Sequence, residues 1–278
     1  MPYKTWYSDS RNEAYQMHIQ LITFSPTGTT NQIANAFAEG IGEDAKHIDL
    51  TAPENRTKRI AVNGDLVVLA APVYGERIPS LYWNTIDQLE GRDTPLVGLA
   101  VYGNIGFGIG LVQFADYAKA HGFRLVGLGA FVGEHSYSNE TINVGYGRPD
   151  AGDLQDASEF GKLIREKLLC GDFSYPDVPK PSVPKFVTKF PDMGTRVLIK
   201  QPSVDPALCV NCGICVSACP VGAIDAETLA ITAKNCLRCY ACVKKCPKNA
   251  RRAAFRFAPF RKIFANAGKK HKENLMLF

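Results

Sequence analysis

The chain has 278 residues, 46% hydrophobic and 21% charged, with a net charge of +5; this globular composition excludes intrinsic disorder and collagen-like repeats and allows about two domains. Its longest apolar run, Leu66 to Val73, is far shorter than the about 20 residues of a membrane-spanning helix, and the first 15 residues hold no apolar signal segment. We therefore expect a cytoplasmic protein without a transmembrane segment.

Residues 17–170, which follow a short N-terminal extension (1–16), alternate between strand-like and helix-like segments. Strands are expected at 17–24, 45–50, 66–71, 95–101 and 124–132, because these runs are apolar and short. Helical stripes lie between and after them, with Ser80 and Asp153 as expected N-caps of two helices. Residues 51–64 are too short and polar for a full helix, so one turn or an irregular crossover is expected there. The pattern predicts an α/β domain with a doubly wound, five-stranded parallel sheet.

The loop after the first expected strand has the composition of an anion site. It reads Ser25-Pro26-Thr27-Gly28-Thr29-Thr30 and opens directly into a helix. Hydroxyl groups and free backbone N–H groups at a helix N-terminus attract anions, and Gly28 permits close approach of the backbone. The loop has no lysine, which argues against a Walker A motif and favours a tightly held monophosphate. A plain turn with an N-cap is the alternative.

Two further loops leave the same edge of the predicted sheet, where ligands of such sheets bind. Both combine aromatic side chains with exposed glycine backbone, which suits a planar ring with polar edges, although ordinary loop packing would also account for each aromatic residue singly. With the phosphate loop, they favour FMN as the ligand. The candidate residues of these loops are Pro72, Val73, Tyr74 and Gly75 in the first, and Tyr102, Gly103, Asn104 and Phe107 in the second.

Residues 17–170 resemble a flavodoxin. The resemblance implies that Ser25, Thr27, Gly28, Thr29 and Thr30 hold the FMN phosphate and that Tyr74 to Arg77 border the isoalloxazine ring. The family commonly has G-D-x-x-Y in the loop after the fourth strand, with the tyrosine stacked on the flavin. This chain has Gly103-Asn104-Ile105-Gly106-Phe107, so Phe107 takes the place of the tyrosine and Asn104 that of the aspartate.

A proline-rich linker is expected at residues 171–206, which hold seven of the 17 prolines. One interpretation is a flexible linker that packs on neither domain. Four apolar residues suggest instead that parts of the linker pack on a domain. They are Phe186, Phe190, Val197 and Ile199.

Eight of the nine cysteines form an internal repeat in residues 207–250. Each half reads C-x₂-C-x₂-C-x₃-C-P, and corresponding cysteines are 27 positions apart. In this spacing three thiolates hold one [4Fe–4S] cluster and the fourth ligates the other cluster. The first predicted ligand set is Cys209, Cys212, Cys215 and Cys246; the second is Cys219, Cys236, Cys239 and Cys242. A zinc site is the alternative, but zinc sites usually use two cysteine pairs.

This segment is similar to a bacterial-type two-cluster ferredoxin, and residues 17–250 together resemble a family that fuses a flavodoxin-like domain to such a ferredoxin. The resemblance implies an electron carrier with redox-protein donors and acceptors. The clusters transfer single electrons and a flavin holds one or two, so our first hypothesis is an intramolecular conduit. The second hypothesis is an FMN-dependent reductase of a small organic substrate, fed with electrons through the clusters.

The sequence offers few proton donors for such a reductase. His135 follows the fifth expected strand on the ligand side of the sheet, but a loop histidine is more often a capping or solvated group, so we assign no catalytic residue. Cys170, the ninth cysteine, is expected to be a spare thiol and not a ligand.

The C-terminal tail, residues 251–278, carries the basic charge of the chain. It holds eight basic residues against one acid, Glu273, a net charge of +7. Phenylalanines alternate with these cations, a pattern that would also suit a nucleic acid or an anionic membrane surface. We favour packing of the phenylalanines on the body, with the basic face turned to an acidic redox partner, and expect no nucleic-acid binding. The phenylalanines are Phe255, Phe257, Phe260 and Phe264.

Overall fold

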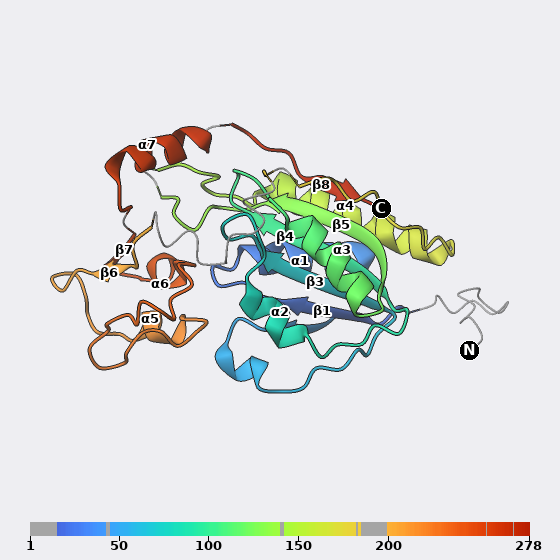
Figure 1. Ribbon diagram of the computed structural model, residues 1–278, viewed down its shortest axis with the longest axis horizontal. Helices are drawn as coiled ribbons and strands as arrows, with labels where there is room; N and C mark the ends of the chain where they lie inside the picture. Colours follow the sequence, from blue (N-terminus) through green and yellow to red (C-terminus); the bar gives the residue numbers. More distant parts are fainter. Residues whose placement is uncertain are drawn as a thin grey trace.

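A six-stranded sheet is the centre of the larger part of the chain (Figure 1). The computed structural model describes residues 16–42, 45–139, 142–181, 183–184, 199–253, 255–268 and 270–278. The strand order is β2-β1-β3-β4-β5-β8. The strands are β1 (Ile19–Thr23), β2 (Ala45–Asp49), β3 (Leu66–Pro72), β4 (Pro95–Tyr102), β5 (Arg124–Val132) and β8 (Leu275–Leu277).

The first five strands run parallel, as the sequence predicts, and they lie in the order 2-1-3-4-5. This order is that of flavodoxin-like doubly wound sheets. Every residue of β3 and β4 is buried, because helices cover both faces of the sheet.

Two helices lie on each face of the sheet. On one face, α1 (Thr29–Ile41) and α4 (Ala151–Leu169) bury Phe37 and Phe160 against the strands, with their rings 5.4 Å apart. On the other face, α2 (Ser80–Ile86) and α3 (Gly110–Ala120) bury Tyr82 and Phe114. The crossover between β2 and β3 holds a single 3₁₀ turn, η1 (Pro53–Arg56), in agreement with the expectation for residues 51–64.

The N-caps of two helices differ from the sequence prediction. Ser80 is the first residue of α2, and Pro79 takes the N-cap position. Asp150, not Asp153, caps α4: its carboxylate accepts the N–H groups of Gly152 and Asp153, while Asp153 bonds back to the N–H of Asp150. Both aspartates thus join one capping box, in which Asp153 is the third helical residue.

The C-terminal segment returns to the sheet, which the sequence analysis did not predict. After α7 (Ala258–Ala267), β8 adds a sixth strand antiparallel to β5, pairing Leu128 with Leu277 and Ala130 with Leu275. Within the segment, Phe264 is buried, whereas Phe257 is 55% exposed, so the expected packing of the phenylalanines holds in part.

The cysteine repeat forms a small module beyond the carboxyl ends of the strands (Figure 1). It contains α5 (Ile214–Ser217) and α6 (Ala241–Lys244), and β6 (Ser203–Val204) pairs with β7 (Arg251–Arg252). The module therefore extends beyond 207–250 on both sides. From the linker, Ile199 is buried and bridges to Phe255, whereas the predictions for Phe186, Phe190 and Val197 lie outside the described residues.

Among the described residues, no helix combines the length and the apolarity needed to cross a membrane.

Candidate functional site

The loop between β1 and α1 presents polar groups at the start of a helix. Gly28, the residue before α1, has φ 96°, and a Cβ placed there would meet no atom within 4 Å. Gly28, as the N-cap, offers α1 no side-chain hydrogen bond, and no acid lies in the first turn of this helix. Thr30 Oγ1 is buried with no hydrogen-bond partner among the described residues. A hydroxyl without a partner beside a helix N-terminus that has glycine as its N-cap fits a phosphate group.

Hydrogen bonds within the loop hold its shape. Ser25 Oγ accepts the N–H of Asn31 at 3.0 Å, and the N–H of Ser25 donates to Thr51 Oγ1 at 2.7 Å. The hydroxyls of Thr27 and Thr29 lie 3.4 Å apart. Thr51 was missed by the sequence analysis; the available signal was its position directly after the second strand, at the same edge of the sheet as the loop.

The loops after β3 and β4 interlock. The N–H of Ile109 donates to the carbonyl of Glu76 at 2.8 Å, and a Cβ on Gly108 would lie 2.1 Å from that carbonyl oxygen. Only glycine therefore permits this contact. Pro72 ends β3, Val73 and Tyr74 pack against the core beneath, and Gly75 has φ 61°. Phe107 packs edge-on against Tyr102, with their ring centroids 5.7 Å apart.

The structure gives two of the predicted flavin-loop residues protein partners. Asn104 is buried, and its Nδ2 donates to the carbonyls of Gly268 at 2.7 Å and Lys270 at 3.0 Å. Its side chain therefore holds the C-terminal segment over the sheet. Gly103 lies under the ring of His135, where a Cβ would come within 2.3 Å. In both cases the residue type is explained by packing within the chain.

The two halves of the cysteine module repeat their backbone geometry. Gly213 and Tyr240, 27 positions apart, both have positive φ and precede the short helices α5 and α6. In the same way, the N–H of Ala223 donates to Cys219 Sγ and the N–H of Ala250 to Cys246 Sγ, each at 3.2 Å. The sequence repeat is thus a structural repeat.

The eight thiols gather in two sets of four. Four of them, the first thiol group, line one small cavity. In the second thiol group, burial is the main cause that raises the pKa of Cys239, and the three other thiols of that group raise it further. Burial likewise raises the pKa of Cys242 to about 12, and Cys215 of the first group contributes, so the two groups adjoin. The first thiol group is Cys209, Cys212, Cys215 and Cys246; the second is Cys219, Cys236, Cys239 and Cys242.

The composition of these two sets fits iron–sulfur clusters. Thiolates are the ligands that iron–sulfur clusters take, and each set draws three members from one half of the repeat and one from the other.

The second half of the module docks on the loop after β5. The rings of Tyr240 and Tyr137 meet edge to face at 4.7 Å. Lys244 forms an ion pair with Glu134 and also donates to the carbonyl of Ser138 at 2.6 Å. These contacts fix the second thiol group at the carboxyl edge of the sheet.

Tyr74 lies where the flavin-type loop meets the cysteine module. Burial raises the pKa of the Tyr74 hydroxyl well above 10, and the nearby Cys239 thiol raises it further. The side chain of Leu237, two residues before Cys239, packs against the same core as Tyr74. The structure thus brings a thiol of the second group to a residue that the sequence analysis assigned to the flavin site.

The other two residues singled out in the sequence have unremarkable surroundings. His135 packs between Tyr137 and Phe264, at ring distances of 4.8 and 4.6 Å. Burial, with help from Lys244, lowers the pKa of His135 to about 3, so the ring is neutral at physiological pH. Cys170 is exposed at the end of α4 and is a free thiol.

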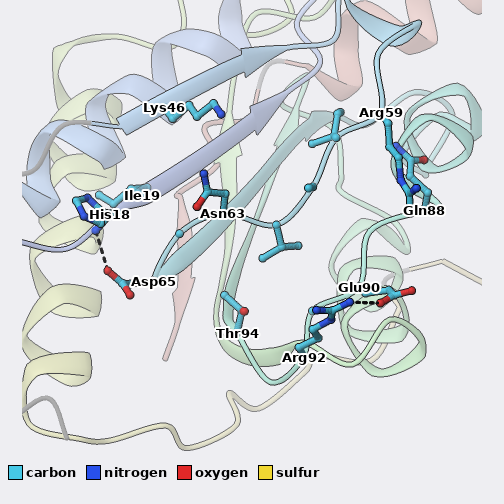
Figure 2. Close-up of a pocket in the computed structure, with 15 residues that line it drawn as sticks. His18, Ile19, Lys46, Arg59, Asn63, Asp65, Gln88, Glu90, Arg92 and Thr94 are labelled. Carbon is cyan, nitrogen blue, oxygen red and sulfur yellow. Dashed lines mark hydrogen bonds and ion pairs between the residues drawn. The ribbon is translucent and has the colours of Figure 1, made fainter. Parts of the chain in front are cut away.

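A separate pocket of about 770 Å³ opens at the opposite edge of the sheet (Figure 2). Its lining includes Lys46 and Arg59, and three of its charged groups are already engaged: Asp65 accepts the N–H of His18, and Arg92 pairs with Glu90. Because ligands of parallel α/β sheets bind at the carboxyl ends of the strands, this pocket is not the candidate site.

Comparisons with known proteins give one family match and several similar solved structures. Residues 201–247 match the family model of a 4Fe-4S dicluster domain. No curated protein matches the chain. A flavodoxin from the domain Archaea is similar at 16% identity and TM-score 0.39, over 55% of this chain and 99% of its own. Flavodoxin 2 from Bacillus cereus is similar at 14% identity and TM-score 0.40, over 54% of this chain and 99% of its own. A flavone reductase is similar at 12% identity and TM-score 0.43, over 57% of this chain and 66% of its own.

The strand order 2-1-3-4-5 gives the sheet of this chain a flavodoxin-like fold, and residues 201–247 match a 4Fe-4S dicluster domain.

Proposed function

We propose that this protein transfers electrons within one chain, between two [4Fe–4S] clusters and a bound FMN, and exchanges them with external redox proteins. The observation that carries the proposal is the proximity of Cys239, in the second thiol group, to Tyr74, in the loop assigned to the flavin. Bound FMN would accept or release electrons singly or in pairs, whereas each cluster would carry one at a time.

The chain supplies the flavin seat at the carboxyl edge of the sheet. Thr30 and the N-terminus of α1 would bind the phosphate, since the Thr30 hydroxyl is buried without a partner among the described residues. Tyr74 and Phe107 would border the ring from the two interlocked loops. These side chains would exclude water from the side of a bound ring that faces the core.

The thiol groups supply the cluster seats with crossed ligation. The first thiol group would hold one cluster and the second group the other, so each half of the repeat lends one thiolate to its neighbour. Because Cys215 influences the ionisation of Cys242, the two seats are adjacent. The order of carriers that follows is first group, second group, flavin.

The first thiol group is the outward end of this order. Cys212 is exposed, and around it lie the exposed apolar side chains of Leu208 (42%), Val210 (58%) and Ile214 (40%). Apolar side chains grouped on a surface mark contact sites for other proteins. An external redox protein would dock here and exchange electrons with the first cluster. We place this exchange in the cytoplasm, where cluster thiols remain reduced.

The alternative of a reductase acting on a small organic substrate needs a proton donor beside the flavin. The candidate for that role, His135, is packed between two aromatic rings and its pKa is lowered to about 3, chiefly by burial. A group that is neutral at physiological pH and enclosed in this way is a poor proton donor. The conduit therefore accounts better for the arrangement.

The test combines cofactor content with electron transfer. Protein purified without oxygen should contain about eight iron atoms and one FMN per chain. A reduced two-cluster ferredoxin, mixed with the protein in a stopped-flow instrument, should bleach the flavin absorbance. Cys212→Ala should slow the bleaching, whereas Cys170→Ala, which removes a thiol outside both groups, should not. Equal bleaching in the wild type and Cys212→Ala would refute the conduit, and absence of flavin would refute the FMN assignment.

A further inference from the structure

Arg251 is a buried cation at the centre of the cysteine module. It is 3% exposed, and its Nη2 donates to the carbonyl of Leu229 at 2.6 Å. The same nitrogen lies 3.5 Å from Cys215 Sγ, and Nε has no hydrogen-bond partner among the described residues. No carboxylate in the described part of the chain pairs with this guanidinium. A buried charge without a counter-ion is costly, so this residue calls for an explanation.

The negative groups that face Arg251 are the thiols of the first group. The side chain lines their cavity and touches Cys215. Cys246 lines the same cavity, and the N–H of Ala250, the neighbour of Arg251 in the chain, donates to Cys246 Sγ at 3.2 Å. Arg251 therefore lies beside two ligands of the first group, Cys215 and Cys246.

The side-chain contacts of Arg251 are with the first thiol group. Its Nη2 lies 3.5 Å from Cys215 Sγ, and the side chain lines the cavity of that group. In the repeat, the position equivalent to Arg251 is Ile224, 27 residues earlier, which is buried and apolar. The second group has a buried arginine beside it, Arg238, but its Nε and Nη1 have no hydrogen-bond partner among the described residues. The two groups therefore differ in that an arginine side chain contacts a thiol of the first group.

We propose that Arg251 sets the order of the two cluster potentials, by making the cluster held by Cys209, Cys212, Cys215 and Cys246 the easier one to reduce. This inference rests on the proposed two-cluster loading. Reduction adds one electron, and hence one negative charge, to a buried cluster, and a fixed cation at short range stabilises that state. In the half-reduced chain, one electron leaves the second cluster and reduces the first, with no bond broken and no proton required.

The consequence concerns the outward end of the conduit. An electron on the first cluster lies near the exposed surface around Val210, and its transfer to the second cluster, beside Tyr74, requires free energy. Arg251 would thus act as an electrostatic trap at the point where a partner protein docks. Its neighbour Arg252 cannot share the role, since its side chain points outward to a surface ion pair with Asp205 at 3.0 Å.

The experiment is a reductive titration with dithionite, monitored by electron paramagnetic resonance. The variants are Arg251→Gln and, as a matched control, Arg252→Gln, which removes the same charge one residue away on the outside. Arg251→Gln should lower the higher of the two reduction potentials by at least 59 mV, which is a tenfold change in the equilibrium constant for one-electron reduction. The lower potential should move less. Arg252→Gln should leave both unchanged, and Arg251→Lys should remain close to the wild type.

Iron content distinguishes failure of the proposed cluster loading from failure of the proposed role of Arg251. Wild-type protein without about eight iron atoms would refute the proposed loading itself. With the clusters present, unchanged potentials in Arg251→Gln, or a larger shift of the lower one, would overturn the role of Arg251. If Arg251→Gln fails to retain iron, the same titration is made on full-length protein carrying Arg251→citrulline, joined semisynthetically at Cys246. Citrulline keeps the shape and N–H donors and removes only the charge, so a potential unchanged there would also overturn the inference.

Discussion

The substitution Asn104→Asp tests why this chain has asparagine where flavodoxins commonly have aspartate. The Asn104 amide donates to two carbonyl oxygens of the C-terminal segment, those of Gly268 and Lys270, at 2.7 and 3.0 Å. A carboxylate has no hydrogen to donate, so both carbonyls would lose their donor and face a negative charge. Each unsatisfied buried polar group costs about 1–3 kcal/mol, so a total of about 2–4 kcal/mol is expected after partial hydration.

The cost should appear in the local stability of the segment that these carbonyls anchor. Native-state hydrogen exchange of the amides in Leu275–Leu277, which pair with β5, reports the opening of that segment. A loss of about 2–4 kcal/mol corresponds to roughly 30- to 900-fold faster exchange. At acid pH the new carboxyl would be protonated and could donate one hydrogen bond, which should restore part of the protection.

The matched control is Asn143→Asp, in the loop after β5. The Asn143 side chain accepts the N–H of Tyr146 through its oxygen, and a carboxylate can accept the same bond. Exchange in Leu275–Leu277 should therefore stay at the wild-type rate. If Asn104→Asp changes exchange by less than about threefold, the two hydrogen bonds do not hold the segment and the reasoning fails.

Four further predictions concern the cofactors, the partner and pH. Thr30→Val should weaken FMN binding roughly 10- to 150-fold, the worth of one hydrogen bond to a charged group, without loss of iron; unchanged flavin affinity in a fluorescence titration would contradict the phosphate seat. Cys219→Ala should give the same paramagnetic spectrum as Cys236→Ala, since crossed ligation puts both in one cluster, and a different spectrum would mean a wrong ligand set. Val210→Glu should slow reduction by an external ferredoxin and spare cofactor content; an unchanged rate would move the docking site elsewhere. Burial holds the pKa of His135 near 3, against 6.5 in the unfolded chain, so the free energy of unfolding should fall as pH drops below 6.5, by about 2 kcal/mol at pH 5. Denaturant unfolding of His135→Gln should show a weaker dependence of stability on pH, and an equally steep dependence would refute the claim.

The cysteine module illustrates what local spacing can determine. Ligand spacing and the 27-residue offset fix which thiols share a half, because three of the four ligands lie within seven residues of chain. The positive φ of Gly213 and Tyr240 follows the same offset, although only one of them is a glycine. The flavin-type loop is predictable for a similar reason, since strand, glycine and helix N-terminus are contiguous in sequence.

Contacts between distant segments were not predictable in this way. Leu275–Leu277 forms a strand because β5, more than 140 residues earlier, offers a free edge, and three residues are too few to show a strand pattern. Asn104 was assigned to the flavin site from its position in a loop, whereas its side chain bonds to residues more than 160 positions away. By residue type, Asp150 and Asp153 are equally suitable as N-cap of α4, and the backbone conformation places Asp150 in that position.

The sequence by itself thus predicted the parallel strands with their intervening helices and the cysteine repeat, because each rests on periodicity or spacing within a short stretch of chain. Only the tertiary structure decided how the domains meet. The pair Tyr74 and Cys239, the ion pair of Lys244 with Glu134, and the burial of Arg251 beside Cys215 each join residues far apart in sequence. Such contacts depend on packing between elements, which no local pattern of residues encodes.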